Sequence, residues 1–337
     1  MVGIKDISKL SGYSKTTVSK VLNGYTDVSK TTREKILKIC DEQGYIPSAL
    51  GRNLSIKRTF TIGVVFSDLT NQGITHPFFS EMLNEFKNEV EKEGYDILLI
   101  GNKVGNYVHS YLSHCRQKAV DGIILLSAHS EEEGIKELVD SDIPMVAMQS
   151  YYDERACFVS DNKKAIREML KHLVENGHKD IGFVYGDLET FDGKERYDAF
   201  KNGMKEFGLE INDNWIFNGS NYTVEDGRIA CQQMLTQEKW PTAMMCASDT
   251  LAIGCMIEMY SNGYDVPKDL SVTGFDDIQI SKLFKAGLTT IRQDKNMMVK
   301  HAVKSLIAQI NGEKFEKGIN VIPCGMEYRE TVRKIEE

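Results

Sequence analysis

The chain lacks any apolar run near the roughly 18 residues needed to span a bilayer. Its start, MVGIKDISKL, has no apolar segment of the kind that a secretory signal peptide requires. Seven cysteines are scattered without a Cys-x-x-Cys pair or a Cys/His ligand spacing, so neither a disulfide framework nor a zinc site is expected. We therefore predict a cytoplasmic protein with reduced, mostly buried thiols, no metal and no cofactor.

Short catalytic motifs are also missing: the sequence has no GxSxG, P-loop, HExxH or Rossmann glycine fingerprint. Two adjacent acids occur at Asp276 and Asp277. Neighbouring carboxylates on one strand point to opposite faces, however, and cannot flank a glycosidic bond. An enzyme is therefore not expected, and a transport binding protein would be exported.

Charge is distributed unevenly along the chain, whose formal net charge is −8. Residues 1–60 contain eleven Lys and Arg against five Asp and Glu, whereas the remainder contains 30 against 44. A basic segment suits phosphate binding, because Lys and Arg displace counterions condensed on a polyanion. A run of charge alone is more often just a solvated surface, so the periodicity of apolar residues has to decide.

Three short helices are predicted in this basic segment. Gly12 separates the first two helices, Ser14 can cap the second, residues 29–32 offer cap hydroxyls for the third, and Gly44 ends it. The predicted apolar stripes are Ile4, Ile7 and Leu10, then Val18, Val21 and Leu22, then Ile36, Leu37 and Cys40. This pattern indicates a helix-turn-helix with a supporting helix, although periodicity alone also allows a small helical bundle.

The segments IKDISKLSGYSKTTVSKVLNG, VSKTTREKILKICDEQGY and IPSALGRNL resemble, in this order, the N-terminal module of the lactose/galactose-repressor family of bacterial transcription regulators. The resemblance runs without a gap over residues 4–54. It implies that the second helix reads DNA through Lys15, Thr16 and Lys20. Backbone and phosphate contacts would come from Ser14, Thr17, Ser19 and Asn23. Lys20 stands where the family commonly has arginine, which replaces a bidentate hold on guanine by a single donor.

Residues 47–58 are predicted to form a hinge helix and a basic linker. A helix of about two turns that contains Gly51 is marginal in water. The resemblance implies that it pairs with its dimer mate in the minor groove, where Leu54 wedges open a base step beside Arg52. Ser48 and Gly51 replace the asparagine and alanine usual in the family, and a plain interdomain linker is the alternative.

Beyond Phe60, short apolar runs alternate with helical stretches, as in a parallel sheet covered on both faces. The runs are TIGVVF, DILLIG, GIILLS and PMVAM, followed by CFVSD, IGFVYG, AMMCAS and SVTGFD. Two sets of four predict two doubly wound lobes, and the resemblance implies a periplasmic-binding-protein-like sensor. We thus expect a small all-α helix-turn-helix head over residues 1–46, the hinge over 47–58, and an α/β effector-binding and dimerisation domain over 59–337.

Ligands of such sheets bind at the carboxyl ends of strands. The resemblance implies that Arg196 grips the effector, Asp276 accepts two hydroxyl hydrogens, and Tyr222 stacks on effector rings. Ser248 replaces an asparagine common at its position, whereas Asp249 is predicted to cap the following helix. The full candidate set is Phe78, Phe79 (with a core role as its alternative), Asp161, Asp192, Arg196, Tyr222, Ser248, Asp276 and Gln293.

A guanidinium, carboxylates and flat aromatic walls together suit a mono- or disaccharide. The purine-binding branch of the family uses an arginine six residues before the Arg196 position, where this chain has Thr190, while Asp192 adds an acid. We therefore predict a ligand-responsive repressor that binds a palindromic operator as a homodimer, with a sugar effector. The alternatives are a purine or sugar-phosphate effector and, from another class, a cytoplasmic sugar-binding protein or enzyme without DNA readout.

Overall fold

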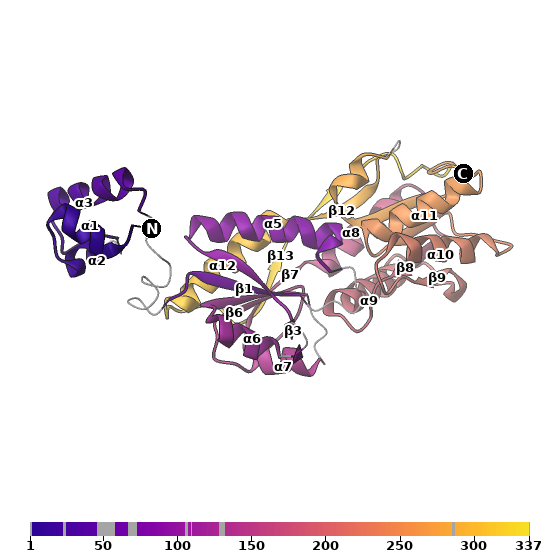
Figure 1. Cartoon of the computed structure of the whole chain (residues 1–337). Helices are drawn as coiled ribbons and strands as arrows, with labels where there is room; N and C mark the ends of the chain where they lie inside the picture. The colour runs from indigo at the N-terminus through magenta and orange to yellow at the C-terminus, as the bar shows by residue number, and fades with distance from the viewer. Residues whose placement is uncertain are drawn as a thin grey trace. The chain divides into compact units, whose positions relative to one another are not determined.

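The computed structural model describes residues 2–22, 25–45, 58–66, 73–104, 107–108, 110–127, 132–284 and 287–336. The chain divides into two compact units, Met1–Phe60 and Thr61–Glu337 (Figure 1). The predicted hinge lies outside the described residues apart from Arg58, and so do the candidate DNA contacts Asn23, Arg52 and Leu54.

The first unit contains the helices α1 (Ile4–Ser11), α2 (Lys15–Leu22) and α3 (Lys30–Glu42). Gly12 ends α1 in the left-handed conformation (φ 76°) and its N–H donates to the Ser8 carbonyl oxygen. Ser14 accepts from the Thr17 amide at 3.1 Å, and Ser29 accepts from the Thr32 amide at 3.2 Å. The caps and the turn predicted from the sequence are therefore confirmed.

The core of this unit consists of Ile7, Val18, Val21, Ile36 and Cys40. Two predicted core residues are wrong: the exposed fractions are 55% for Leu10 and 41% for Leu37. The buried stripes join Ile7 to Ser11 and Ile36 to Cys40, four residues apart in each case. Leu10 and Leu37 are each one residue off these stripes, which turns them about 100° away from the core.

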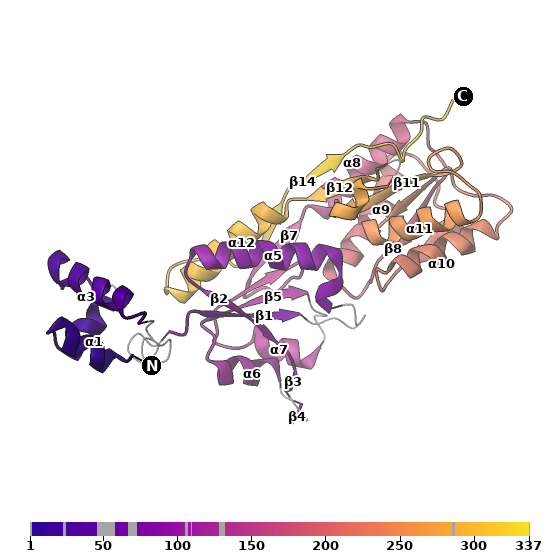
Figure 2. The ribbon, with the colours of Figure 1, turned by 45° about the horizontal axis from the view of Figure 1, so that its top comes forward.

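The second unit is built on two six-stranded sheets (Figure 2). In sheet order the first contains β13 (Gly318–Ile322), β7 (Ala156–Ser160), β6 (Met145–Met148), β5 (Gly122–Ser127), β1 (Thr61–Phe66) and β2 (Asp96–Ile100), all parallel. The second contains β14 (Cys324–Glu327), β12 (Thr289–Gln293), β11 (Ser271–Asp276), β10 (Ala243–Cys246), β8 (Ile181–Tyr185) and β9 (Ile216–Asn218), with only β14 antiparallel to its neighbour. A short hairpin pairs β3 (Lys103–Val104) with β4 (Tyr107–Val108).

Helices cover both sheets, which is why the strands are nearly continuous apolar runs. On the first sheet, α5 (Pro77–Lys92) and α12 (Lys295–Ile310) lie side by side on one face, while α6 (Tyr111–Lys118) and α7 (Glu133–Val139) cover the other (Figures 1 and 2). On the second sheet, α8 (Asn162–Glu175) pairs with α9 (Phe191–Glu206), and α10 (Val224–Leu235) pairs with α11 (Asp249–Ser261). Short 3₁₀ turns lie at η1 (Gly73–Thr75), η2 (Asp213–Trp215) and η3 (Gln279–Lys282).

The predicted division of strands between the lobes needs correction. The run CFVSD does not open the second lobe, because β7 pairs with β6 and β13 in the first sheet. The chain passes between the sheets three times: between β7 and α8, between β12 and α12, and between β13 and β14. Alternation along a sequence marks strands but not the sheet that each joins, so the late strands β12, β13 and β14 were not anticipated.

Among the described helices of the chain, none is both long and apolar enough to cross a membrane. Within the same described part, no three His, Cys, Asp or Glu side chains are grouped so as to hold a metal ion. All seven cysteines are unpaired and all but Cys324 are buried, which confirms the prediction of mostly buried thiols.

Candidate functional site

Helix α2 has two basic residues and no acidic one. Lys15 and Thr16 are exposed, while Thr17, Ser19 and Lys20 are half-buried. The Lys20 ammonium pairs with the Asp27 carboxylate, and this hydrogen bond lowers the pKa of Asp27. The exposed fractions of the two side chains are 42% and 54%, so solvent screens this ion pair and it contributes little to stability.

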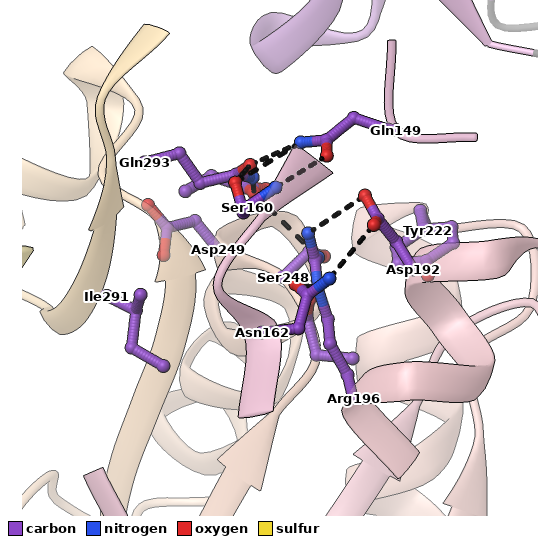
Figure 3. Close-up of polar contacts among 12 residues, drawn as sticks. Gln149, Ser160, Asn162, Asp192, Arg196, Tyr222, Ser248, Asp249, Ile291 and Gln293 are labelled. Carbon is purple, nitrogen blue, oxygen red and sulfur yellow. Dashed lines mark hydrogen bonds and ion pairs between the residues drawn. The ribbon is translucent and has the colours of Figure 1, made fainter. Parts of the chain in front are cut away.

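Five candidate effector residues lie together where the chain passes between the sheets: Asp192, Arg196, Tyr222, Ser248 and Gln293 (Figure 3). At the carboxyl end of β6, Gln149 donates to Gln293 at 2.5 Å, and the Ser160 hydroxyl donates to the same Gln293 oxygen at 2.5 Å. Gln293 in turn donates to the Asp276 carboxylate at 2.5 Å. A buried hydrogen-bonded chain therefore joins the first lobe to the second.

Arg196 occupies the second-lobe side of this site and is only 4% exposed. Its Nε donates to Asn162 at 3.0 Å, its Nη1 donates to the Ala247 carbonyl oxygen at 2.9 Å, and its guanidinium lies 3.7 Å from the Phe275 ring centroid. Two carboxylates flank it. Asp192 lies at 3.5 Å (Figure 3), and Asp276 lies at 4.0 Å. Asn162 also donates to Asp192 at 2.9 Å, so the cluster is held from several elements.

The start of α9 places this group. Thr190 caps the helix by accepting from the Gly193 amide at 3.2 Å, and its hydroxyl donates to the Asp187 carbonyl oxygen at 2.7 Å. Asp192 lies in the first turn, where the helix dipole favours a negative charge, and Arg196 follows one turn later on the same face. The cap thus fixes the first residue of α9 and, with it, the positions of Asp192 and Arg196 on the helix.

Burial dominates the electrostatics of the carboxylates. It raises the pKa of Asp192 to about 6, against the lowering effect of Arg196. It raises the pKa of Asp276 to about 6 as well, again opposed by Arg196. For Arg196 itself burial opposes the charged form, but the attraction of Asp192 and Asp276 outweighs it, so its pKa lies above the usual value. The site therefore presents a charged donor between two strong acceptors.

Tyr222 contacts the site from the loop before α10. Its backbone is in the left-handed region (φ 53°) and its carbonyl oxygen accepts from the Thr250 hydroxyl at 2.7 Å. Its ring packs directly over Gly186, where an added Cβ would lie only 1.9 Å from the phenol oxygen. Burial raises the pKa of this phenol to about 12, so it remains a neutral donor.

Two candidates serve mainly as helix caps. Ser248 caps α11 by accepting from the Leu251 amide at 3.3 Å, and Asp161 caps α8 by accepting from the Lys164 amide at 3.2 Å. The prediction that Asp249 caps α11 is wrong. Its buried carboxylate instead accepts from the Ile278 amide at 2.9 Å and from the Thr290 hydroxyl, which fastens β12 and the loop after β11 to α11.

The aromatic pair at the start of α5 divides between two environments. Phe78 is buried, with an exposed fraction of 4%. Phe79 is half-buried and packs edge-on against Phe66, with ring centroids 4.8 Å apart. Both rings belong to the first turn of α5, which packs on the first sheet, so they lie on the first-lobe side.

Three polar residues of the site were missed from the sequence: Gln149, Ser160 and Asn162. All are buried and all belong to the network around Gln293 and Arg196. The signal that could have found them is a polar residue directly after an apolar strand, as in MVAMQS and ACFVSDN. Such residues lie at the carboxyl edge of the sheet, where ligands of α/β folds bind.

The turn after β11 has unusual backbone geometry. Two successive residues other than glycine have positive φ, 123° at Asp276 and 49° at Asp277. Conformations of this kind cost on the order of 1–3 kcal/mol each and persist where surrounding contacts impose them. Asp277 turns away from Asp276 and pairs with Arg329 at 2.6 Å and Lys282 at 3.3 Å. The carboxylates of Asp276 and Asp277 therefore point to different partners, as the sequence predicts for neighbouring residues on a strand.

These features define a class of protein. One unit is a helix-turn-helix head with a basic second helix, and the other is an α/β sensor of two lobes with a polar site at their crossovers. A model of bacterial regulatory proteins of the lacI family matches residues 3–48. A model of periplasmic binding proteins and the sugar binding domain of the LacI family matches residues 59–330. The chain belongs to the LacI family.

Similar proteins agree with this assignment. The transcriptional repressor PurR of Vibrio parahaemolyticus is 36% identical, covering 99% of this chain and all of the relative. PurR of Haemophilus influenzae is 33% identical over 92% of this chain and 91% of the relative.

Solved structures share the fold. The lac repressor dimer bound to operator and the anti-inducer ONPF has a TM-score of 0.82 at 24% identity, covering 98% of this chain and 99% of that chain. A complex of the regulator CelR with cellobiose has a TM-score of 0.72 at 24% identity, covering 98% of this chain and all of that chain. The chain is thus a ligand-responsive transcriptional regulator of the repressor type, not an enzyme.

Proposed function

We propose that this protein is a cytoplasmic homodimeric repressor whose hold on a palindromic operator is controlled by a sugar. The observation that carries the choice of effector is Arg196, a buried donor between the carboxylates of Asp192 and Asp276. A sugar offers many hydroxyl groups, each of which can donate to one group and accept from another. Such a ligand can satisfy the arginine, both acids and the amide of Gln293 at once.

On the DNA side, we propose that Lys15, Thr16 and Lys20 read base edges from the exposed surface of α2, with Ser14, Thr17, Ser19 and Asn23 at the backbone. One short helix contacts too few bases for specificity, and a dimer reads two half-sites. Leu54 and Arg52 would complete binding in the minor groove.

A purine effector is the second candidate. It is favoured by the relatives named PurR, which match nearly the whole chain at 33–36% identity. Against it stands the local role of Thr190, whose hydroxyl is occupied by the Gly193 amide and the Asp187 carbonyl oxygen at the start of α9. The acid at Asp192 likewise favours a ligand that donates from several hydroxyls.

The test of the effector class is a thermal-shift screen of the purified chain with cellobiose, lactose, glucose, glucose 6-phosphate, hypoxanthine and guanine. A compound at a hundred times its Kd stabilises the native state by about 2.7 kcal/mol, which is readily detected. We expect a sugar to raise Tm and Arg196→Met to abolish the shift. Arg167→Met is the matched control, because Arg167 is an exposed arginine that pairs with Glu206 across the surface of the same lobe. A shift with hypoxanthine or guanine alone would overturn the sugar assignment.

The DNA-binding part is tested on an operator selected from random duplexes. Fluorescence anisotropy should show that Lys20→Ala weakens binding to that operator by about 1 kcal/mol, the low end of the range for a bidentate base contact, because lysine offers a single donor. Lys38→Ala is the control, since Lys38 lies on α3 and pairs with Glu42. Reciprocity requires the sugar and the operator to change each other's affinity by the same factor. An unchanged operator affinity at saturating sugar would refute the allosteric part.

A further inference from the structure

An ion pair that is partly buried links α5 of the first lobe to the point where the chain returns from the second lobe. Glu81 Oε2 lies 3.2 Å from Lys295 Nζ. The exposed fractions of the two side chains are 23% and 14%. The neighbouring ion pair of Lys87 with Glu91 on the same α5 is far more open, with exposed fractions of 56% and 51%. Its burial strengthens the attraction between Glu81 and Lys295 relative to the open Lys87–Glu91 pair.

Both partners also bind the strained turn of the second lobe. Lys295 Nζ donates to the Asp276 carbonyl oxygen at 2.9 Å. The Gln279 amide donates to Glu81 Oε1 at 3.0 Å. The ion pair therefore holds the two ends of a four-residue turn that begins with two left-handed residues, Asp276 and Asp277.

The same pair lies next to candidate effector residues on both sides. Lys295 Nζ is 5.4 Å from the ring centroid of Phe78 in the first lobe, and the carbonyl oxygen it binds belongs to Asp276 in the second. One residue further on, Asn296 donates to Glu85 at 3.1 Å, one turn along α5 from Glu81. Helix α5 is thus fastened at two successive turns to the crossover segment.

We propose that Glu81 and Lys295 are positioning residues that hold the Asp276 turn in the geometry that accepts the effector. This inference rests on the proposed function of Asp276. Since Glu81 belongs to the first lobe and the turn to the second, separation of the lobes breaks the Glu81–Gln279 bond and releases the turn. The carboxylate of Asp276 is then presented correctly only when the lobes are closed, so effector affinity depends on lobe closure.

The competing explanation is that Glu81 and Lys295 form an ion pair that only stabilises the fold. The chemistry of their contacts with the turn distinguishes this explanation from a positioning role. In the exchanged pair, Glu81→Lys with Lys295→Glu, opposite charges still face each other. A lysine at position 81 cannot accept from the Gln279 amide, however, and a glutamate at position 295 cannot donate to the Asp276 carbonyl oxygen. The exchanged pair therefore restores the attraction without restoring the turn contacts.

The experiment is hydrogen–deuterium exchange of the full chain, followed in peptides that cover residues 276–284. We expect Glu81→Ala, Lys295→Met and the exchanged pair each to increase exchange of the Gln279 amide by roughly tenfold. Lys87→Met and Glu91→Gln are matched controls on α5 and should leave it unchanged. Urea unfolding of each variant distinguishes this local effect from a general loss of stability.

Full recovery of slow exchange in the exchanged pair would overturn the proposal, as would unchanged exchange in Lys295→Met. The six-compound thermal-shift screen, repeated on Lys295→Met, should give a smaller shift than the parent chain gives for the same compound. If no sugar raises the Tm of the parent chain, the proposed effector class is refuted. The hydrogen–deuterium exchange data decide the role of Glu81 and Lys295 independently.

Discussion

Replacing Asp192 by asparagine should change the pH dependence of stability in a defined direction. The folded pKa of Asp192 is about 6, above the ordinary value of 3.8, because the carboxylate is buried. The native state then holds this proton more tightly than the unfolded chain does. Stability contributed through this group is complete below about pH 4 and is lost as pH rises through about 6. Asparagine does not titrate, so the stability of the variant does not fall with pH through this group.

The magnitude follows from the shift. A difference of about two pKa units corresponds to about 3 kcal/mol in full, of which about 1.4 kcal/mol falls between pH 5 and pH 7.5. The stability of Asp192→Asn relative to the parent chain should therefore increase by about 1.4 kcal/mol over that interval, whatever its sign at either end. The comparison with the parent chain cancels the contributions of titrating groups that do not interact with Asp192.

Urea unfolding followed by tryptophan fluorescence measures this change in the second lobe, to which Asp192 belongs. The chain has two tryptophans, and both Trp215 and Trp240 pack against the core that contains β8 and α9. Asp198→Asn serves as the matched control, because Asp198 is a half-exposed acid on the same helix α9 that pairs with Lys201. A relative stability that is the same at both pH values, or that falls as pH rises, would refute the burial of an Asp192 carboxylate beside Arg196.

Three further outcomes are expected. Gly186→Ala places a Cβ 1.9 Å from the Tyr222 phenol oxygen, so it should displace that ring. Isothermal titration should then show a sugar affinity at least tenfold lower, and an unchanged Kd would contradict the role of Tyr222. Ser29→Ala removes the cap of α3 and should cost about 1 kcal/mol in the amide-exchange stability of that helix, whereas Ser29→Gly should cost only a few tenths; equal effects would argue against a capping role. Burial lowers the pKa of His178 from 6.5 to about 4. The stability that His178 contributes is therefore present above pH 6.5 and is lost as pH falls towards 4. Urea unfolding of His178→Gln should no longer show that loss, and a loss of the same size in the variant would contradict the reasoning.

The sequence alone determined the features that depend on neighbouring residues. Ser14 and Ser29 cap helices because a hydroxyl three positions before a free amide can reach it, and Gly12 ends α1 because it adopts positive φ without strain. The strands of the sensor were visible as apolar runs because both faces of each sheet are covered. The resemblance of the first residues to the LacI family then pointed to Arg196 and Asp276.

Tertiary structure alone decided which segments meet. Strand β7 joins the first sheet through pairing with β6 and β13, and β13 lies about 160 residues later in the chain, so no local pattern encodes that choice. Leu10 and Leu37 are exposed because the small core reaches only one stripe of each helix.

The polar network of the site was hidden for the same reason. Gln149 and Gln293 are 144 positions apart, and their contact exists only when the sheets are assembled. The pairing of Glu81 with Lys295 also appears only when α5 and α12 pack together. Capping and periodicity act over one or two helical turns, whereas the chemistry of this site depends on contacts that only the folded sensor brings within hydrogen-bonding distance.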